Sequence, residues 1–294
     1  MAGRTARRRV TRICVGDTGN GAAAGDSALG KAAVSERADL LAAEEPLGIR
    51  IGGEAVSLTM RTPGDDVDLT AGFLFTEGII SSASDIVSIR ICDGSQCGHD
   101  HEAGDAMGNI ADVTLRAGLA AGPRRNFLTS SACGVCGKAS IAELRVPGRF
   151  GLDEDLVQVP ADVLAGLPDA LRRAQRVFER TGGLHAAGLF SAAGELMAVR
   201  EDVGRHNAVD KVVGWALQGG LLPLRGRVLL VSGRASFELV QKTVLAGVPV
   251  LAAVSAPSSL AVELAEDAGL TLAGFVRGGS LNVYSAPWRV IPPR

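Results

Sequence analysis

The chain has 294 residues and a formal net charge of −2, with 47% hydrophobic and 21% charged residues. This is an ordinary globular composition, and the length is enough for about two domains. The near-neutral charge argues against nucleic acid as the main partner, and no apolar run reaches the roughly 18 residues of a membrane helix.

The cysteines and the first residues bear on the compartment. Five cysteines, an odd number in a chain of this length, do not have the pattern of a disulfide framework, and free thiols persist in reducing compartments. The arginine-rich start, MAGRTARRRVTRI, is followed by a polar, glycine-rich stretch instead of the apolar segment of an export signal. We therefore expect a cytoplasmic protein.

The first part of the chain is rich in predicted strands. Residues 1–35 are basic and then rich in glycine and alanine, without a sustained period, so we expect a flexible segment there. Two short strands over 47–64 are joined by two glycines, which indicates a hairpin, and a helix with an acidic start follows. Strands over 86–92 and 110–115 flank a polar loop. These elements predict a strand-rich N-terminal domain over residues 36–129.

The remainder, residues 130–294, is predicted to be an α/β domain. A helix over 160–183 has apolar residues at helical spacing, a hairpin over 184–202 follows, and a second helix spans 207–220. Helical stretches then alternate with three continuous apolar strands, at 228–232, 249–255 and 270–276. That alternation is typical of βαβ units in a sheet covered on both faces. The predicted fold class is therefore α/β, with an α+β N-terminal part.

Two cysteines stand three positions apart in SSACGVCGKAS, where Cys133 and Cys136 are each followed by glycine. The glycines let the backbone turn sharply and leave both sulfurs exposed. Metal ligation, a disulfide switch and a thiol that carries sulfur are the competing interpretations. A structural zinc site needs four ligands. Cys97, His99 and His101 could supply some of them, but they lack a second pair at zinc-finger spacing and are equally typical of a surface loop.

Two enzyme classes fit the cysteine pair less well. A thioredoxin-like protein has its CxxC between a first strand and a helix, whereas this pair lies deep in the chain. A zinc deaminase has His-x-Glu ahead of its CxxC, but His185 follows the pair and Ala187 stands in the place of the glutamate. His185 is equally a candidate core histidine. Sulfur chemistry on exposed thiols remains.

Two loops that follow predicted strands have the residues of an anion site. Ser232, Gly233 and Arg234 follow a buried strand and open a helix, where backbone amides can face a phosphate. The segment FVRGGS, residues 275–280, places Arg277 beside two glycines that allow close backbone approach. Each loop alone is also typical of an ordinary turn. Ligands bind at neighbouring strand ends of an α/β sheet, so together the loops predict a phosphate-bearing ligand.

The run REDVGRHNAVDK, residues 200–211, is the densest in polar groups. One interpretation is a solvated helix start, in which Asp210 and Lys211 form local ion pairs. The other is a ligand site after a glycine turn, formed by Arg205, His206 and Asn207.

Five motifs in one order resemble the formate dehydrogenase accessory protein family, FdhD: TSSACGVCGKASI, TGGLHAAGLF, REDVGRHNAVDKVVG, SGRASFELVQK and GFVRGGSLNVY. The resemblance covers residues 40–288. It implies a sulfurtransferase that takes persulfide sulfur from a cysteine desulfurase. The sulfur would pass to Mo-bis(molybdopterin guanine dinucleotide) for the maturation of formate dehydrogenase. A cytidine-deaminase-like, three-layer C-terminal domain and a homodimer are also implied.

The resemblance also implies roles for residues. Cys133 would bear the persulfide with Cys136 as its partner, and the site would hold no metal ligands. The implied cofactor-binding segment is Phe275, Val276, Arg277, Gly278, Gly279 and Ser280. The polar loops add Ser232, Gly233, Arg234, Arg205, His206 and Asn207, and a GDP-like nucleotide would mimic the cofactor because arginine suits pyrophosphate. A chaperone that only binds the cofactor, and a zinc-dependent deaminase-like hydrolase, stay open as alternatives.

Overall fold

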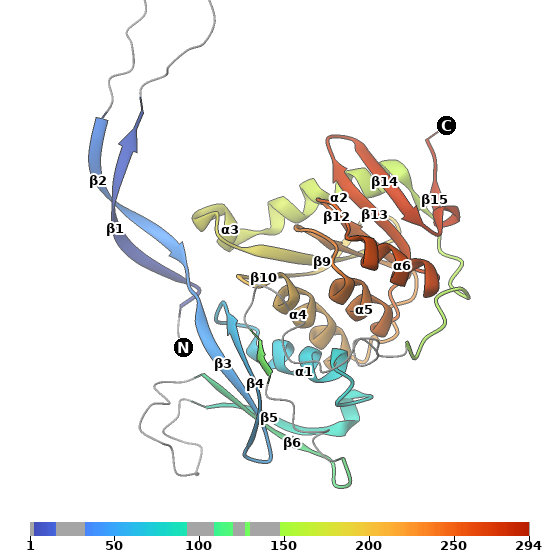
Figure 1. Cartoon of the computed structure of the whole chain (residues 1–294), viewed down its shortest axis with the longest axis horizontal. Coiled ribbons are helices and arrows are strands. Elements are labelled where there is room, and N and C mark those ends of the chain that lie inside the picture. The colour runs from blue at the N-terminus through green and yellow to red at the C-terminus, as the bar shows by residue number, and fades with distance from the viewer. Residues whose placement is uncertain (1–2, 16–32, 93–108, 120–126, 130–147, 294) are drawn as a thin grey trace, which may run out of the picture.

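The computed structural model describes residues 3–15, 33–92, 109–119, 127–129 and 148–293 (Figure 1). A five-stranded sheet, a six-stranded sheet and the helices around them form the body, and a two-stranded ribbon projects from it. No helix among these residues is long and apolar enough to cross a membrane.

The six-stranded sheet is the centre of the second part of the chain. Its order is β10-β9-β11-β12-β13-β14, in which β11, β12 and β13 are parallel and the outer pairings are antiparallel. The strands are β9 (His185–Ser191), β10 (Leu196–Asp202), β11 (Arg227–Val231), β12 (Val250–Ala253), β13 (Thr271–Arg277) and β14 (Ser280–Ser285). The hairpin and the three apolar strands predicted from the sequence are confirmed.

Helices cover both faces of this sheet. On one face lie α4 (Arg205–Gln218), α5 (Phe237–Leu245) and α6 (Ser259–Asp267), and on the other lies α2 (Ala161–Ala174), which leads into α3 (Arg176–Thr181). Alternate strand residues enter the two cores, since Leu229 packs in the cluster with α4 and α5 whereas Leu230 packs with α2. The α/β class is confirmed, and the particular likeness to cytidine deaminases stays a prediction.

The helix predicted over 160–183 is divided at Gln175. The buried carboxylate of Glu201 accepts the backbone N–H groups of Val177 at 2.9 Å and Phe178 at 2.8 Å, and so satisfies the first turn of α3. The sequence does not reveal this break, because the apolar spacing continues across it and the capping carboxylate comes from β10.

The five-stranded sheet has the order β5-β6-β3-β4-β7. Its strands are β3 (Glu45–Ile51), β4 (Glu54–Arg61), β5 (Ile86–Cys92), β6 (Ile110–Leu115) and β7 (Phe127–Thr129). The turn between β3 and β4 lies at Gly52 and Gly53, whose φ angles are 58° and 85°, so the predicted hairpin is confirmed. A 3-10 turn, Ala83–Asp85, precedes β5. Two small strands, β8 (Val159–Pro160) and β15 (Val290–Ile291), form a separate parallel pair.

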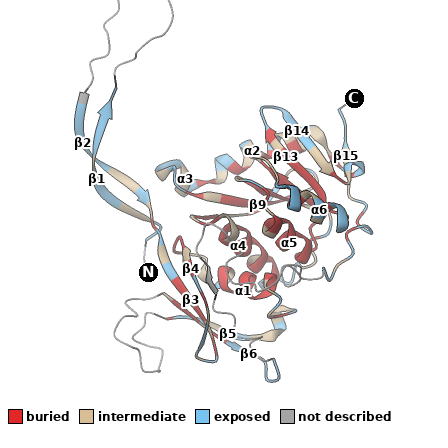
Figure 2. Ribbon diagram, in the orientation of Figure 1, coloured by how far each residue is buried: buried red, intermediate tan, exposed pale blue. Residues whose placement is uncertain are grey.

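Helix α1 (Asp66–Thr76) joins the two parts by a close crossing with α4. A Cβ atom on Gly72 would lie 1.9 Å from the carbonyl oxygen of Asp210, and one on Gly214 would lie 1.8 Å from that of Asp68. The two backbones are therefore in direct contact, and only glycine fits at either position. One buried cluster runs from Leu47 of β3 through both helices to the six-stranded sheet (Figure 2). The predicted boundary near residue 129 does not interrupt the core.

The expectation of a flexible segment over residues 1–35 is wrong for part of that stretch. Strand β1 (Thr5–Cys14) pairs with β2 (Ala33–Ala42) in an antiparallel ribbon that runs from Thr5 opposite Ala42 to Cys14 opposite Ala33. The ribbon is largely exposed on both faces (Figure 2). A strand without a buried face has no alternation of apolar and polar residues, and this alternation is the main signal for strands. Residues 16–32 lie outside the described part of the chain.

Candidate functional site

Four chain segments meet at one edge of the six-stranded sheet. Strand β9 begins there at His185, which pairs with Asp202 at the end of β10. Strand β11 ends there, and the backbone N–H of Ser232 donates to the carbonyl of Ala186 at 3.0 Å. The residue after β12, Val254, donates its N–H to the carbonyl of Val231 at 3.1 Å. This is the carboxyl edge of the parallel strands, where the sequence predicts a ligand.

A pocket of about 600 Å³ opens at this edge, between the strand ends and the helices α2 and α3. Its volume is in the range of small-molecule sites. Leu171, Leu184, Val203 and Val254 give it an apolar lining, and His185 and Ser232 contribute polar groups. On the helical wall, the guanidinium of Arg172 lies 4.3 Å from the centre of the Phe178 ring, so a flat cationic and aromatic pair faces the pocket. The pocket can take a ring system with polar substituents.

Of the predicted loop after β11, only Ser232 lines the pocket. Its hydroxyl accepts the N–H of Ala186 at 2.9 Å. A Cβ on Gly233 would lie 3.4 Å from Nδ1 of His185, so glycine allows the loop to pass close to the imidazole. Arg234, in contrast, is exposed.

Arg205 has an unsatisfied donor at the same edge. Its Nε is buried and has no hydrogen-bond partner in the described part of the chain, and its Cδ lies 3.9 Å from the position of a Cβ on Gly233. A buried donor without an acceptor costs about 1–3 kcal/mol. An anion that accepts from Arg205 would remove this cost, so the geometry fits the predicted phosphate better at Arg205 than at Arg234.

His206 and Asn207 contact other protein groups. Nε2 of His206 lies 2.9 Å from Oε2 of Glu238 and 3.4 Å from Oγ of Ser236. Because the same nitrogen meets both oxygens, these residues are not a Ser-His-Glu relay, which needs both ring nitrogens. The Asn207 amide donates to the carbonyl of Met60 at 2.8 Å and accepts from the Thr59 hydroxyl at 3.3 Å. Asn207 therefore joins α4 to β4.

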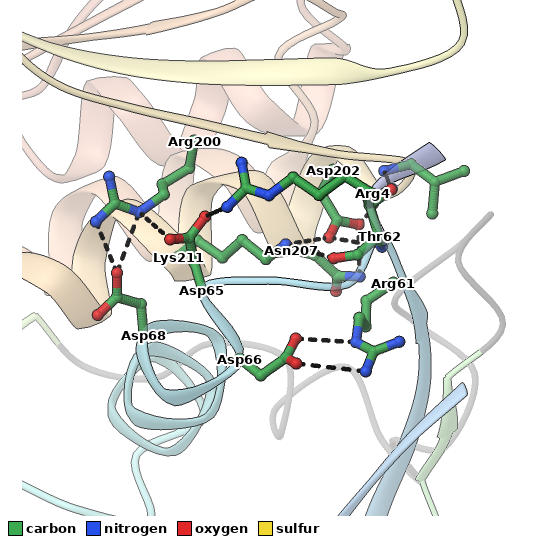
Figure 3. A network of polar contacts seen from close by, with 12 residues as sticks. Arg4, Arg61, Thr62, Asp65, Asp66, Asp68, Arg200, Asp202, Asn207 and Lys211 are labelled. Carbon is green, nitrogen blue, oxygen red and sulfur yellow. Dashed lines mark hydrogen bonds and ion pairs between the residues drawn. The ribbon is translucent and has the colours of Figure 1, made fainter. Parts of the chain in front are cut away.

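A buried ion pair lies beneath this edge (Figure 3). Nζ of Lys211 is 2.7 Å from Oδ2 of Asp202 and donates to the carbonyl of Thr62 at 2.9 Å. The second carboxylate oxygen of Asp202 accepts the N–H of Gly204 at 2.8 Å and the amide of Asn207 at 3.0 Å. The interpretation of a solvated helix start with local ion pairs is wrong, because Lys211 is buried and its partner Asp202 lies on β10.

Asp210 pairs elsewhere, with Nζ of Lys242 on α5 at 2.8 Å. Residues next to each other on a helix point in different directions, so Asp210 and Lys211 reach different neighbouring elements. Burial alone would lower the pKa of Lys242, but the carboxylates of Asp210 and Glu77 outweigh it and raise that pKa above its ordinary value.

Further ion pairs tie the start of α1 to this edge. Asp68 and Asp65 of the α1 start face Arg200 of β10, with Nη2 of Arg200 2.7 Å from Oδ2 of Asp68, and Asp65 also pairs with Arg4 (Figure 3). The buried Arg61 pairs with Asp66 at 2.9 Å. No motif signals these contacts, because each joins residues from separate strands and helices.

His185 is expected to make the stability of the protein depend on pH. Burial is the largest cause that lowers its pKa, and the charges of Arg205 and His206 act in the same direction against that of Asp202. The unfolded chain then binds the proton more readily, so the free energy of unfolding falls as the pH drops below about 6.5. His185→Gln should flatten this fall, measured as urea unfolding between about pH 7.5 and about pH 5.5. A slope equal to that of the parent protein would contradict this assignment.

The predicted segment 275–280 is a turn at the other end of the same edge. Phe275 has the left-handed φ of 53° and donates its N–H to the carbonyl of Ser255, which follows Val254 of the pocket. Val276 is buried, and Arg277, Gly278, Gly279 and Ser280 are exposed. The two glycines, with φ of 58° and 76°, turn β13 into β14, and the Arg277 guanidinium lies 5.6 Å from the Phe275 ring centre. Their predicted contact with a cofactor stays a prediction.

Cys133 and Cys136 lie outside the described residues, as do Cys97, His99 and His101. The described chain ends before the cysteine pair at Thr129 of β7, which pairs with Thr59 of β4. It resumes at Gly148, where a Cβ would lie 3.0 Å from Val244 of α5. Within the described ranges, no group of three or more His, Cys, Asp or Glu side chains could hold a metal ion.

The fold and this edge define an α/β protein with a ligand pocket at the strand ends. The family model described as the FdhD/NarQ family matches residues 42–291, and the chain belongs to that family. It is 55% identical over 289 residues to the sulfur carrier protein FdhD of Mycolicibacterium paratuberculosis, covering 97% of this chain and 98% of that one. The sulfur carrier protein FdhD of Nocardia farcinica is 54% identical over 291 residues, covering 99% and 96%.

A crystal structure of a protein described as a formate dehydrogenase accessory protein, from Desulfotalea psychrophila, shares the fold. The TM-score is 0.69 at 23% identity, over 97% of this chain and 99% of the other. The match spans both sheets, so the joined arrangement of the two parts is common to both proteins.

Proposed function

We propose that this protein is a sulfur carrier in the maturation of formate dehydrogenase. The observation that carries the proposal is the similarity to proteins named sulfur carrier protein FdhD, at 53–56% identity across several actinobacterial relatives. The finer statement is that the protein is a sulfurtransferase. It takes sulfur from a cysteine desulfurase and gives it to Mo-bis(molybdopterin guanine dinucleotide), which is its cargo, and it works as a homodimer.

The first transfer needs only a thiolate and a persulfide. The thiolate of Cys133 attacks the outer sulfur of the donor's persulfide, the donor's S–S bond breaks, and the donor leaves as a thiolate. Cys133 then carries the persulfide, with no net change of oxidation state. The thiolate of Cys136 then attacks Sγ of Cys133, the bond to the outer sulfur breaks, and that sulfur leaves as sulfide to the acceptor while a Cys133–Cys136 disulfide remains.

Chain connectivity supports a meeting of the persulfide and the pocket edge. Thr129 is the last described residue before Cys133. Thr129 pairs with Thr59, whose hydroxyl donates to Asn207 at the start of α4. Arg205 and His206 come directly before Asn207 at that helix start. Arg205 and the described strand that leads toward the carrier cysteine therefore lie at the same corner of the fold.

The pocket edge suits a nucleotide cargo in two respects. Its Arg205 has a buried donor that lacks an acceptor in the described chain, and a pyrophosphate supplies such acceptors. The Arg172 and Phe178 pair provides a flat surface on which a base can stack. These residues would bind and orient the cargo, and the cysteines would carry the sulfur to its molybdenum.

The proposal is tested by mass. The protein is incubated with a purified cysteine desulfurase and cysteine, and then weighed intact without reductant. A gain of about one sulfur (~32 Da) that reductant removes is expected, because a persulfide forms on a nucleophilic thiolate. The rival function is a chaperone that binds the cofactor without carrying sulfur. Normal binding of the nucleotide with no mass gain would favour that rival.

Nucleotide binding is expected to depend on Arg205 and Arg277. Each charge-assisted hydrogen bond to phosphate contributes about 1.5–3 kcal/mol, so Arg205→Ala and Arg277→Ala should each weaken the binding of GDP about tenfold or more. Titration calorimetry with GDP measures the effect. Arg173→Ala, which removes an exposed arginine of α2, is the matched control and should leave the affinity unchanged. Parental affinity in either test variant would remove that arginine from the site.

A further inference from the structure

One side of helix α2 contributes polar groups to the wall of the pocket. Asp169, Arg172 and Gln175 stand three positions apart along the helix and at its end, so they lie on the same side of it. All three line the pocket, and they are called the α2 stripe below. The stripe combines a hydrogen-bond acceptor, a donor and a carboxamide that is both. Stacking of a base on Arg172 and Phe178 leaves the other two groups of the stripe without a role.

Gln175 has a buried carboxamide that lacks partners. The residue is 5% exposed and lines the pocket. Its side chain makes no hydrogen bond with any residue that the structure describes. Buried amides in proteins are nearly always hydrogen-bonded, because an unpaired one is unfavourable. A ligand in the pocket that offers a carbonyl or an N–H group would supply the missing partner.

Asp169 is a carboxylate in a pocket that is proposed to bind a phosphorylated ligand. Arg172 and Arg173 stand three and four positions further along, which is the spacing of helical ion pairs. Asp169 nevertheless makes no ion pair within the described part of the chain, and the Arg172 guanidinium lies over the Phe178 ring instead. A carboxylate repels phosphate. Its presence in this pocket is favourable only where the ligand donates hydrogen bonds to it.

Guanine has the hydrogen-bonding edge that these side chains match. It presents N1–H and the 2-amino group as adjacent donors, with the O6 carbonyl beside them. The two donors match the two oxygens of the Asp169 carboxylate, and O6 can accept from the amide of Gln175. Adenine presents N1 as an acceptor in the same place, so its lone pair would face the carboxylate.

We propose that the α2 stripe selects guanine over adenine in the pocket. Asp169 accepts from N1–H and the 2-amino group, Gln175 donates to O6, and Arg172 stacks on the ring, while Arg205 is left for the phosphates. The inference rests on the guanine-nucleotide cargo of the proposed function. It adds the residues that determine which base this cargo must carry.

Calorimetric titration with GDP and ADP tests the proposal. The parent should bind GDP about tenfold or more tightly than ADP, because a matched bidentate contact discriminates between bases by about that factor. Gln175→Leu should reduce this preference, since the group that binds O6 is lost. Asp162→Asn changes an exposed aspartate of α2 that does not line the pocket, so this control should keep the parental preference. Thermal unfolding of each variant checks that its fold is intact.

Asp169→Asn gives a sharper result, because it predicts a gain of binding. The asparagine amide places a donor where the carboxylate had an acceptor. It therefore opposes the 2-amino group of guanine and pairs with the 2-carbonyl group of xanthine. The variant should bind GDP about tenfold less tightly, and xanthosine diphosphate about tenfold more tightly, than the parent does. A misfolded protein would not gain affinity for either nucleotide.

Three results would overturn the inference. The first is equal affinity of the parent for GDP and ADP, and the second is parental GDP affinity in Asp169→Asn. The third concerns pterin, which has the same edge as guanine. Binding of 6-hydroxymethylpterin that is lost in Asp169→Asn, while GDP binding persists, would assign the stripe to the pterin ring of the cargo. The ~32 Da gain of the parent is measured without nucleotide, so failure of sulfur transfer and failure of base selection are told apart.

Discussion

Replacement of Cys133 by alanine is expected to abolish the gain of one sulfur atom and the maturation of formate dehydrogenase. The thiolate is the nucleophile in the proposed transfer, and alanine offers no other atom that could attack a persulfide. The intact mass of Cys133→Ala should therefore stay at the parental value where the parent gains ~32 Da. GDP affinity should be unchanged, because the pocket residues are intact.

Cys14 provides the matched control. It is an exposed, free cysteine at the end of β1, so unspecific sulfur exchange should reach it as readily as any thiol of the chain. Cys14→Ala should accept sulfur like the parent. A mass gain that persists in Cys133→Ala and disappears in Cys14→Ala would refute the assignment of the carrier cysteine.

Lys211→Met is expected to lower the free energy of unfolding by about 3–5 kcal/mol, because it leaves the carboxylate of Asp202 buried without its cation. Asp202 and Lys211 are 0% and 1% exposed. Methionine fills most of the space of the lysine stem, so the loss comes from charge and not from a cavity. Urea unfolding of the parent and the variant at the same pH measures the difference.

The exposed pair of Arg90 and Asp112, at 3.0 Å, is the comparison for Lys211. The Arg90 side chain is 68% exposed, and a surface pair contributes at most about 1 kcal/mol. Arg90→Met should therefore change the free energy of unfolding by far less than Lys211→Met does. Equal losses in the two variants would show that burial of the Asp202 pair is not what stabilises it.

The sequence predicts the elements of this fold well where one face is buried. Continuous apolar strands such as 228–232, and the spacing of Leu164, Leu167 and Leu171, correspond to a sheet covered on both faces and to α2. The exposed strand Thr5–Cys14 has no alternation of apolar and polar residues, so the sequence pattern does not predict it. The break at Gln175 depends on Glu201, and no local rule describes a cap from a distant strand.

The candidate site was predictable in type but not in detail. Gly-Arg loops after strands point to the sheet edge where the pocket lies, and Ser232 lines that pocket. Arg205 and Arg234 look equivalent in sequence. Only the fold shows that Arg205 has a buried Nε without a partner among the described residues, whereas Arg234 is exposed. Arg172 and Phe178 carry no motif at all. Their pairing depends on where α3 begins, which is set by Glu201.

The glycine contact between α1 and α4 has a consequence for hybrid chains. A chimera that takes its first 129 residues from one relative and the rest from another must bring Gly72 and Gly214 from different parents into van der Waals register. A methyl group on either side would force the helices apart and open the shared interior to water. Substitutions at these two positions therefore affect both halves of the chain. A chimera joined at residue 129 should be insoluble unless it has both glycines.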